Sequence, residues 1–239
     1  MKIVVMSDLH GYLPKIHEGF DLMLLGGDIV ALDYQRSSTL SEEWYESEFI
    51  DWLNELPFND KQSKVIMIAG NHSVGIERMS HKQKAGFIET MKKYSGNRWV
   101  YLENEQYDFT CGDQTISIYG TPQCKIFGHW AFMLNPEKLE EYYSKIPENI
   151  DILLTHDSPS INNVGTILQK TYWSDGTVDA GNPQLTDAIL KKKPKYVFCG
   201  HIHSGNHELT EYLPGKYIRQ CSILDEHYNY AYEPFYFIW

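Results

Sequence analysis

The chain has 239 residues, of which 42% are hydrophobic and 22% are charged, a composition typical of a soluble globular protein that buries its core without disulfides. Its formal net charge of −11 disfavours stable binding to nucleic acid, because the chain would repel a polyphosphate backbone. The apolar runs are too short for a membrane span or a signal peptide and the four cysteines include no C-x-x-C pair, so we expect a cytoplasmic protein with free thiols and no membrane contact.

The first part of the chain alternates between short apolar runs and helical patterns. Runs rich in β-branched and other apolar residues predict buried strands at residues 3–6, 22–25 and 65–69. Residues 41–56 have the apolar spacing of an amphipathic helix, with Ser41 as its N-cap and Pro57 just beyond its end. A further helix is predicted over residues 80–94.

The middle of the chain changes character, because its apolar runs become short and are separated by polar or glycine-containing turns. Three runs predict antiparallel strands of a second sheet, at residues 99–102, 107–110 and 115–119. A helix is then predicted over residues 136–146, with Asn135 as its cap and Pro136 at its first position.

The last part returns to alternating strands and helices. Strands are expected at residues 150–154 and 196–199, with a helix over residues 185–193 between them. The aromatic tail, residues 217–239, is interpreted as closing strands. Because no linker of domain-separating length interrupts the pattern, the whole chain, residues 1–239, is predicted to form one domain.

Five of the predicted strands end in side chains that can hold metal ions. In chain order these are Asp8 and His10, Asp28, Asn71 with His72, His156, and His201 with His203. Ligands of α/β sheets bind beyond the carboxyl ends of the strands, so the fold would gather these side chains at one rim. Each motif alone has a structural explanation, such as a turn or a helix cap. The ordered set favours a metal centre.

The ligand types indicate the chemistry of such a centre. A carboxylate such as that of Asp28 can bridge two cations about 3.5–4 Å apart. A cation pair would make water a nucleophile at neutral pH and would offset the charge of a phosphoester. The mixture of Asp, Asn and His without Cys favours Mn, Fe, Zn, Co or Ni over an all-oxygen calcium site.

The motif set SDLHG, GGDIV, GNH, LLTHDSP and GHIH closely resembles the calcineurin-like metallophosphoesterase superfamily. Within it, YGTPQ at residues 119–123, WAF at residues 130–132 and PKYVFCGHIHSG at residues 194–205 resemble the small brain "239" group. The resemblance implies an α/β fold, a four-layer αββα sandwich of two mixed β-sheets with helices outside. Its metal site would lie at the carboxyl ends of the strands.

The resemblance also implies a role for each residue. The first ion would be held by Asp8, His10 and His203, and the second by Asn71, His156 and His201. Asp28 would bridge the two ions, for which the resemblance favours manganese. His72 would stay off the metals and act as a general acid on the leaving oxygen or stabilise charge on the phosphoryl group. Ser73 stands where many members have an acidic residue that orients this histidine, so the partner of His72 is left open.

These observations predict a metal-dependent phosphoesterase that acts on small phosphodiesters such as cyclic nucleotides. The alternatives are a phosphomonoesterase or protein phosphatase, a nuclease, and a non-catalytic scaffold. The acidic charge counts against the nuclease, and the complete ligand set counts against the scaffold. Substrate choice is expected to depend on the loop at residues 160–180, where Tyr172, Trp173 and Asp175 could overhang the site. His207, just beyond His203, is a further candidate, and the oligomeric state is left open.

Overall fold

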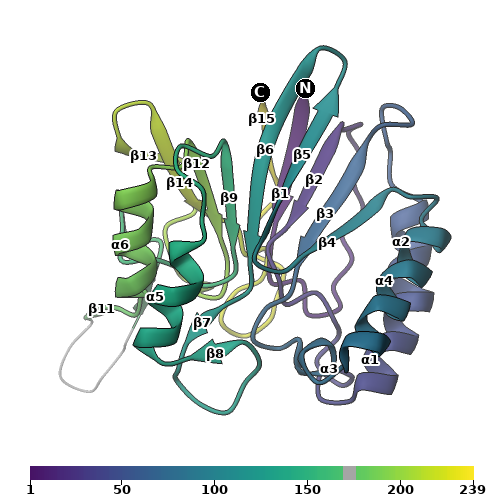
Figure 1. The fold of residues 1–239 in the computed structure, drawn as a ribbon, viewed down its shortest axis with the longest axis horizontal. Helices are drawn as coiled ribbons and strands as arrows, with labels where there is room; N and C mark the ends of the chain where they lie inside the picture. The colour runs from purple at the N-terminus through teal and green to yellow at the C-terminus, as the bar shows by residue number, and fades with distance from the viewer. Residues whose placement is uncertain (169–175) are drawn as a thin grey trace.

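The computed structural model describes residues 1–168 and 176–239. Two β-sheets face each other at its centre, and helices cover the outer face of each sheet (Figure 1). The loop residues Tyr172, Trp173 and Asp175 lie outside the described part of the chain.

The first sheet has the strand order β15-β1-β2-β3-β4. Its strands are β1 (Lys2–Met6), β2 (Leu22–Leu25), β3 (Lys64–Ile68), β4 (Trp99–Leu102) and β15 (Phe235–Ile238). All are parallel except β15, which pairs antiparallel with β1. The prediction that residues 99–102 form an antiparallel strand of the second sheet is wrong. The helix between β3 and β4 is a crossover connection, which returns the chain parallel to β3 in the same sheet.

The second sheet has the order β13-β14-β12-β9-β6-β5. Its strands are β5 (Glu105–Cys111), β6 (Gln114–Thr121), β9 (Ile152–Thr155), β12 (Tyr196–Cys199), β13 (Thr210–Leu213) and β14 (Lys216–Gln220). The predicted antiparallel pairing of β5 and β6 is confirmed, and β6, β9, β12 and β14 run parallel. Two small sheets are additional to the prediction, because their strands are only two or three residues long. They are β7 (Cys124–Lys125) with β8 (Met133–Leu134), and β10 (Thr166–Leu168) with β11 (Thr177–Asp179).

The first helix on the first sheet begins earlier than the sequence pattern predicts. A continuous helical segment comprises α1 (Ser38–Trp44), the π-helical turn η1 (Tyr45–Phe49) and α2 (Ile50–Asn54). Its N-cap is Ser37, whose hydroxyl accepts from the backbone N–H of Leu40, and not Ser41. The hydroxyl of Ser41 is buried and donates to the carbonyl of Tyr34, inside the first turn. The short α3 (Val74–Glu77) follows β3, and α4 (His81–Tyr94) starts at a capping box of Ser80 and Gln83.

The helices on the second sheet start at side-chain caps. Helix α5 (Pro136–Ser144) has Asn135 as its N-cap, as predicted. Helix α6 (Pro183–Lys192) starts two residues before the predicted position, because Asn182 accepts from the N–H of Leu185 and Pro183 occupies the first turn.

Three apolar layers hold these four layers of structure together. Side chains alternate along each strand, so Val4 and Met6 of β1 face the helices while Ile3 and Val5 face the second sheet. In the second sheet, Leu153 of β9 packs under α5 and α6 while its neighbours face inward. The predicted αββα sandwich with two mixed sheets is therefore confirmed.

Candidate metal centre

The predicted ligand residues lie on five loops at the carboxyl ends of parallel strands. The loops after β1, β2 and β3 belong to the first sheet, and those after β9 and β12 belong to the second. Asp8, His10, Asp28 and His201 have φ angles of 55°, 44°, 53° and 70°, in the left-handed region that residues other than glycine seldom adopt. This backbone turns the chain sharply within a few residues of the end of each strand.

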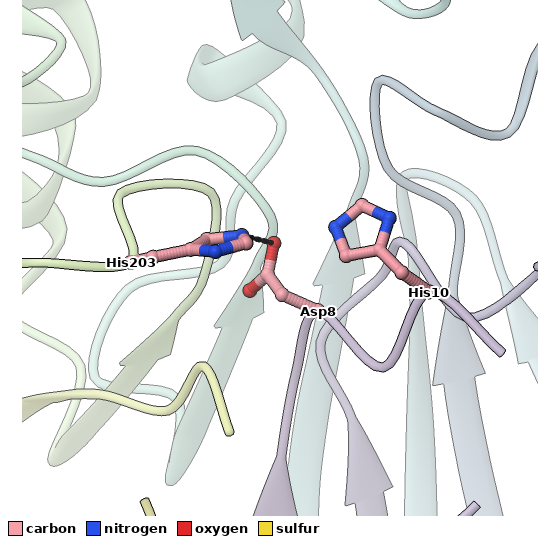
Figure 2. A group of neighbouring side chains, drawn as sticks. All are labelled: Asp8, His10 and His203. Carbon is pink, nitrogen blue, oxygen red and sulfur yellow. Dashed lines mark ion pairs between the residues drawn. The ribbon is translucent and has the colours of Figure 1, made fainter. Parts of the chain in front are cut away.

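Two ion pairs join the sheets across this rim. Nε2 of His156 lies 3.2 Å from Oδ2 of Asp28, and Nε2 of His203 lies 3.4 Å from Oδ1 of Asp8. Figure 2 shows the second pair, with His10 on the other side of Asp8. The backbone N–H of His201 donates to both carboxylate oxygens of Asp8 at 3.0 Å. The second sheet therefore contributes the nitrogen donors in these contacts and the first sheet the carboxylates.

Three sets of side chains bring metal-binding atoms within 4.8 Å of one another. They are Asp8 with His10 and His203, His10 with Asp28 and His72, and Asp8 with Asp28 and His156. Oδ1 of Asn71 joins the group through Nε2 of His156, at 2.8 Å. The ring of His201 lies at the edge, with its centroid 5.3 Å from that of His156. The structure thus gathers six of the seven predicted ligands, with His201 at the edge, and it also brings in His72, which was predicted to stay off the metals.

The donor set fits a pair of divalent cations. Asp8, Asp28 and His156 are almost fully buried, which is costly for charged groups without compensating partners. Nδ1 of His10 is also buried and has no hydrogen-bond partner in the described residues. Clustered carboxylate, amide and imidazole donors are ligands for Mn, Fe, Zn, Co and Ni.

Mutual attraction shifts the pKa values of the paired groups. Burial alone would raise the pKa of Asp8 and of Asp28, but the histidines beside them lower both below the ordinary carboxylate range. Burial alone would lower the pKa of His156 and of His203, but the carboxylates raise both to about 9. His10 differs, because burial dominates and lowers its pKa to about 4. In the metal-free protein we therefore expect both His156 and His203 to be protonated at neutral pH.

Backbone carbonyls orient the two paired histidines. Nδ1 of His156 donates to the carbonyl of Gly26 at 2.9 Å, and Nδ1 of His203 donates to that of Asp225 at 2.7 Å. Each bond leaves Nε2 to face the carboxylates, which is how hydrogen-bonded imidazoles are presented to metals. Position 70, next to the His156 ring, requires glycine. A Cβ there would lie only 2.3 Å from Oδ1 of Asp28.

The partner of His72 is Gln35, which sequence reasoning missed. Nδ1 of His72 contacts Oε1 of Gln35, and the His72 ring stacks on Trp130 with centroids 4.3 Å apart. The guanidinium of Arg36 lies on Trp130, also at 4.3 Å. Ser73 does not contact the His72 ring in this way. Its hydroxyl accepts from the N–H of Gly70 at 3.0 Å and closes the turn at residues 70–73. Nothing in the local sequence pairs Gln35 with a residue so far along the chain.

A cavity of about 400 Å³ opens over the centre. Besides predicted site residues, its wall includes Lys125, Phe127, Ile167, Ala180, Ile202 and Tyr228. Lys125 donates from Nζ to the carbonyl of Gly181 at 2.8 Å, and its backbone N–H donates to Asp157 at 2.8 Å. Asp157 therefore anchors the cavity wall. His207 donates to the carbonyl of His203 at 2.9 Å and stacks on Tyr232, so it supports the centre without lining the cavity.

Comparisons with known proteins show which family this chain resembles. The family model for calcineurin-like phosphoesterases matches residues 1–205, which include every predicted ligand. UPF0046 protein C25E10.12 of Caenorhabditis elegans is 28% identical over 99% of this chain and 80% of its own length. Metallophosphoesterase domain-containing protein 1 of Homo sapiens is 25% identical over 85% of this chain, and the match spans 61% of the human protein.

The fold also has a solved counterpart. Phosphopantetheinyl hydrolase of Mycobacterium tuberculosis superposes with a TM-score of 0.56 over 95% of this chain and 90% of its own, at 13% identity. That likeness concerns the fold, whereas the sequence relatives confirm the resemblance to the 239 group. The chain belongs to the calcineurin-like phosphoesterase family.

Proposed function

We propose that this chain is a metal-dependent phosphoesterase that hydrolyses small phosphodiesters of the cyclic-nucleotide kind. The observation that carries the proposal is the convergence of two buried carboxylates and several imidazoles beneath a small cavity. Members of the family are hydrolases with a binuclear metal centre. Metal-dependent hydrolysis is therefore a property of the family, and the preference for phosphodiesters is what we propose for this chain.

The proposed ligand assignment divides the donors between two ions. One ion would be held by Asp8, His10 and His203, the other by Asn71, His156 and His201, with Asp28 shared. Support for the shared role comes from Oδ2 of Asp28, which lies 3.2 Å from Nε2 of His156 and 4.0 Å from Nε2 of His10. Manganese is our first choice, with Fe, Zn, Ni or Co as the other candidates. Two such ions would activate water at neutral pH and offset charge on the phosphoryl oxygens.

His72 is proposed to act on the leaving oxygen. Its backbone N–H donates to Oδ1 of Asp28 at 2.7 Å, which fixes the residue beside the proposed bridging carboxylate. Because Nδ1 is engaged by Gln35, the protonated ring would donate from Nε2 toward the cavity that it lines. A histidine so placed can protonate an alkoxide as it departs or stabilise charge on the phosphoryl group.

Two properties favour a small diester. A cavity of about 400 Å³ is the size of a small-molecule site, and Phe127, Ile167 and Ile202 give it an apolar wall for an organic ester group. The net charge of −11 disfavours long polyanions, which counts against the nuclease alternative.

Lys125 is a specific observation in favour of a phosphomonoesterase, since its ammonium at the cavity wall could bind the extra charge of a monoester dianion.

The test is hydrolysis of matched chromogenic diester and monoester substrates by metal-stripped protein, with Mn, Zn, Ni, Mg or nothing added back. We expect turnover only with added metal, and faster turnover of the diester. Faster turnover of the monoester would replace the proposal with a phosphatase. Folded, metal-loaded protein that turns over neither substrate would contradict an enzymatic role and favour the scaffold alternative.

A further inference from the structure

Tyr228 borders the metal centre from a part of the chain that the family match does not reach. The match ends at residue 205, whereas Tyr228 lies on the turn at residues 225–229. Its side chain lines the cavity, and 43% of the residue remains exposed. Its ring centroid lies 4.8 Å from that of His10 and 5.7 Å from that of His203, with edge-to-face geometry in both cases. The ring therefore adjoins two of the predicted ligands of one metal ion.

The turn that carries Tyr228 is tied to the centre through Asp225. The carbonyl of Asp225 accepts from Nδ1 of His203 at 2.7 Å and from the N–H of Tyr228 at 3.0 Å. Its carboxylate accepts from the N–H groups of His227 and Asn229, each at 2.8 Å. One backbone carbonyl thus sets the positions of both a predicted metal ligand and the tyrosine. The loop is built to hold this side chain at a fixed place beside the cavity.

Tyr228 adopts a backbone conformation that is unfavourable for its residue type. Its φ is +61°, in the left-handed region where a Cβ crowds the following carbonyl. Strained backbone of this kind persists where the surrounding bonds enforce it, and it is concentrated at functional sites. Glycine or asparagine would satisfy the turn more easily, so the turn itself does not explain a tyrosine there.

Tyr230 is a natural comparison in the same segment. It is 39% exposed, nearly as much as Tyr228, but it stacks on Tyr12 with centroids 4.9 Å apart and does not line the cavity. Packing therefore accounts for Tyr230. The phenol of Tyr228, by contrast, makes no hydrogen bond within residues 1–168 and 176–239. A phenol on the cavity wall that has no partner among those residues can donate to a bound ligand.

We propose that Tyr228 is a substrate-contacting residue whose phenol donates a hydrogen bond to a non-bridging oxygen of the bound phosphoryl group. This inference rests on the proposed function, because it needs a phosphoryl group at the metal centre. Diesters, monoesters and inorganic phosphate all carry such an oxygen, so inorganic phosphate is a suitable probe that requires no turnover.

The experiment measures binding of inorganic phosphate to manganese-loaded protein by titration calorimetry. Tyr228→Phe removes only the hydroxyl, and Tyr230→Phe is the matched control from the same segment. We expect Tyr228→Phe to weaken phosphate binding by about tenfold or more, the effect of losing one hydrogen bond to a charged group, with metal content unchanged. Tyr230→Phe should bind phosphate like the wild type.

Equal phosphate affinity for wild type and Tyr228→Phe would overturn the inference, as would a metal-loaded wild type that binds no phosphate. The result stays distinct from the test of the proposed function. A wild-type protein that binds phosphate but hydrolyses neither chromogenic ester would contradict the proposed function, while weaker binding by Tyr228→Phe would still support the tyrosine contact. Where turnover is seen, KM for the diester should rise more than kcat falls.

Discussion

The two sheets meet at one rim but contribute different chemistry to it. The loops of the first sheet supply oxygen donors, from Asp8, Asp28 and Asn71, together with His10. The loops of the second sheet supply imidazoles, from His156, His201 and His203. In the proposed assignment neither sheet holds an ion alone, because each ion takes ligands from the loops of both sheets.

The two halves share one backbone feature and differ in another. Asp8, His10 and Asp28 of the first sheet and His201 of the second all adopt left-handed backbone just beyond the strand ends. On the second sheet, the C-terminal tail supports the loop after β12, where Nε2 of Gln220 donates to the carbonyls of Gly200 and Ile202, both at 2.7 Å. The ion pairs His156–Asp28 and His203–Asp8 join the two sheets at the centre, so the proposed metal site depends on that junction.

The largest effect is expected from breaking the junction at Asp28. Asp28→Asn keeps the shape of the side chain but removes the negative charge of its carboxylate. His156 faces that charge, and both metal ions are proposed to share it. Activity should fall by about a thousandfold or more, together with metal occupancy, since loss of a buried charge partner costs about 3–5 kcal/mol. Metal analysis and diester hydrolysis measure both. Asp33→Asn, on the exposed part of the same loop, is the control and should behave like wild type. Full metal occupancy in Asp28→Asn would rule out a shared carboxylate.

His72→Ala separates chemistry from metal binding within the first sheet. The ring contributes to the cavity wall, so its loss should lower kcat by about 10²–10⁴-fold, the usual contribution of a general acid. Because His72 is proposed to stay off the metals, metal content should not change. His81→Ala, at the exposed start of α4, is the matched control. Loss of one ion from His72→Ala would instead identify the ring as a ligand, as its proximity to His10 and Asp28 allows.

Gln35 allows a finer test of the same histidine. Gln35→Leu removes the acceptor for Nδ1 of His72 and should lower kcat by about tenfold with little change in KM, the scale typical of orienting hydrogen bonds. Gln35→Glu keeps an acceptor at that position and should recover most of the activity. If both variants lose activity equally, the contact with Nδ1 does not orient the ring.

The smallest effect concerns the pH dependence of the metal-free protein. The pKa of His156 and of His203 is raised from 6.5 to about 9 in the folded state. Their contribution to stability is therefore complete below about pH 6.5 and is lost as the pH rises through about 9. Metal-free protein should melt about 2–4 °C lower at pH 9.5 than at pH 6.5, the shift expected for about 1 kcal/mol. Scanning calorimetry with and without manganese checks this, because metal-loaded protein should lack the drop. A Tm that rises over this range would contradict the cross-sheet pairs.

The sequence was informative where a single strand and its following loop decide the outcome. Buried runs and the polar residues at their ends predicted strands β1, β2, β3, β9 and β12 and the residues that gather at their rim. The alternation of predicted strands and helices along the chain also predicted the fold class. The roles of the individual ligands stay predictions, since proximity alone does not distinguish a ligand such as His10 from a neighbour such as His72.

The local pattern of apolar and polar residues did not predict contacts between residues far apart in the sequence. The placement of β4 depends on the crossover through α4, and the start of α1 depends on which of two nearby serines can reach a free backbone N–H. Gln35 and Tyr228 have no local signature, because the histidines that they contact lie far away in the chain. The cavity wall likewise combines loops that only the folded chain brings together.

The most direct test of a centre shared by both sheets is anomalous diffraction from crystals of manganese-loaded protein. We predict two anomalous peaks about 3.5–4 Å apart, both in contact with Asp28, one beside His203 and the other beside His156. A single ion held only by residues of one sheet, or no ion at this rim, would contradict the account.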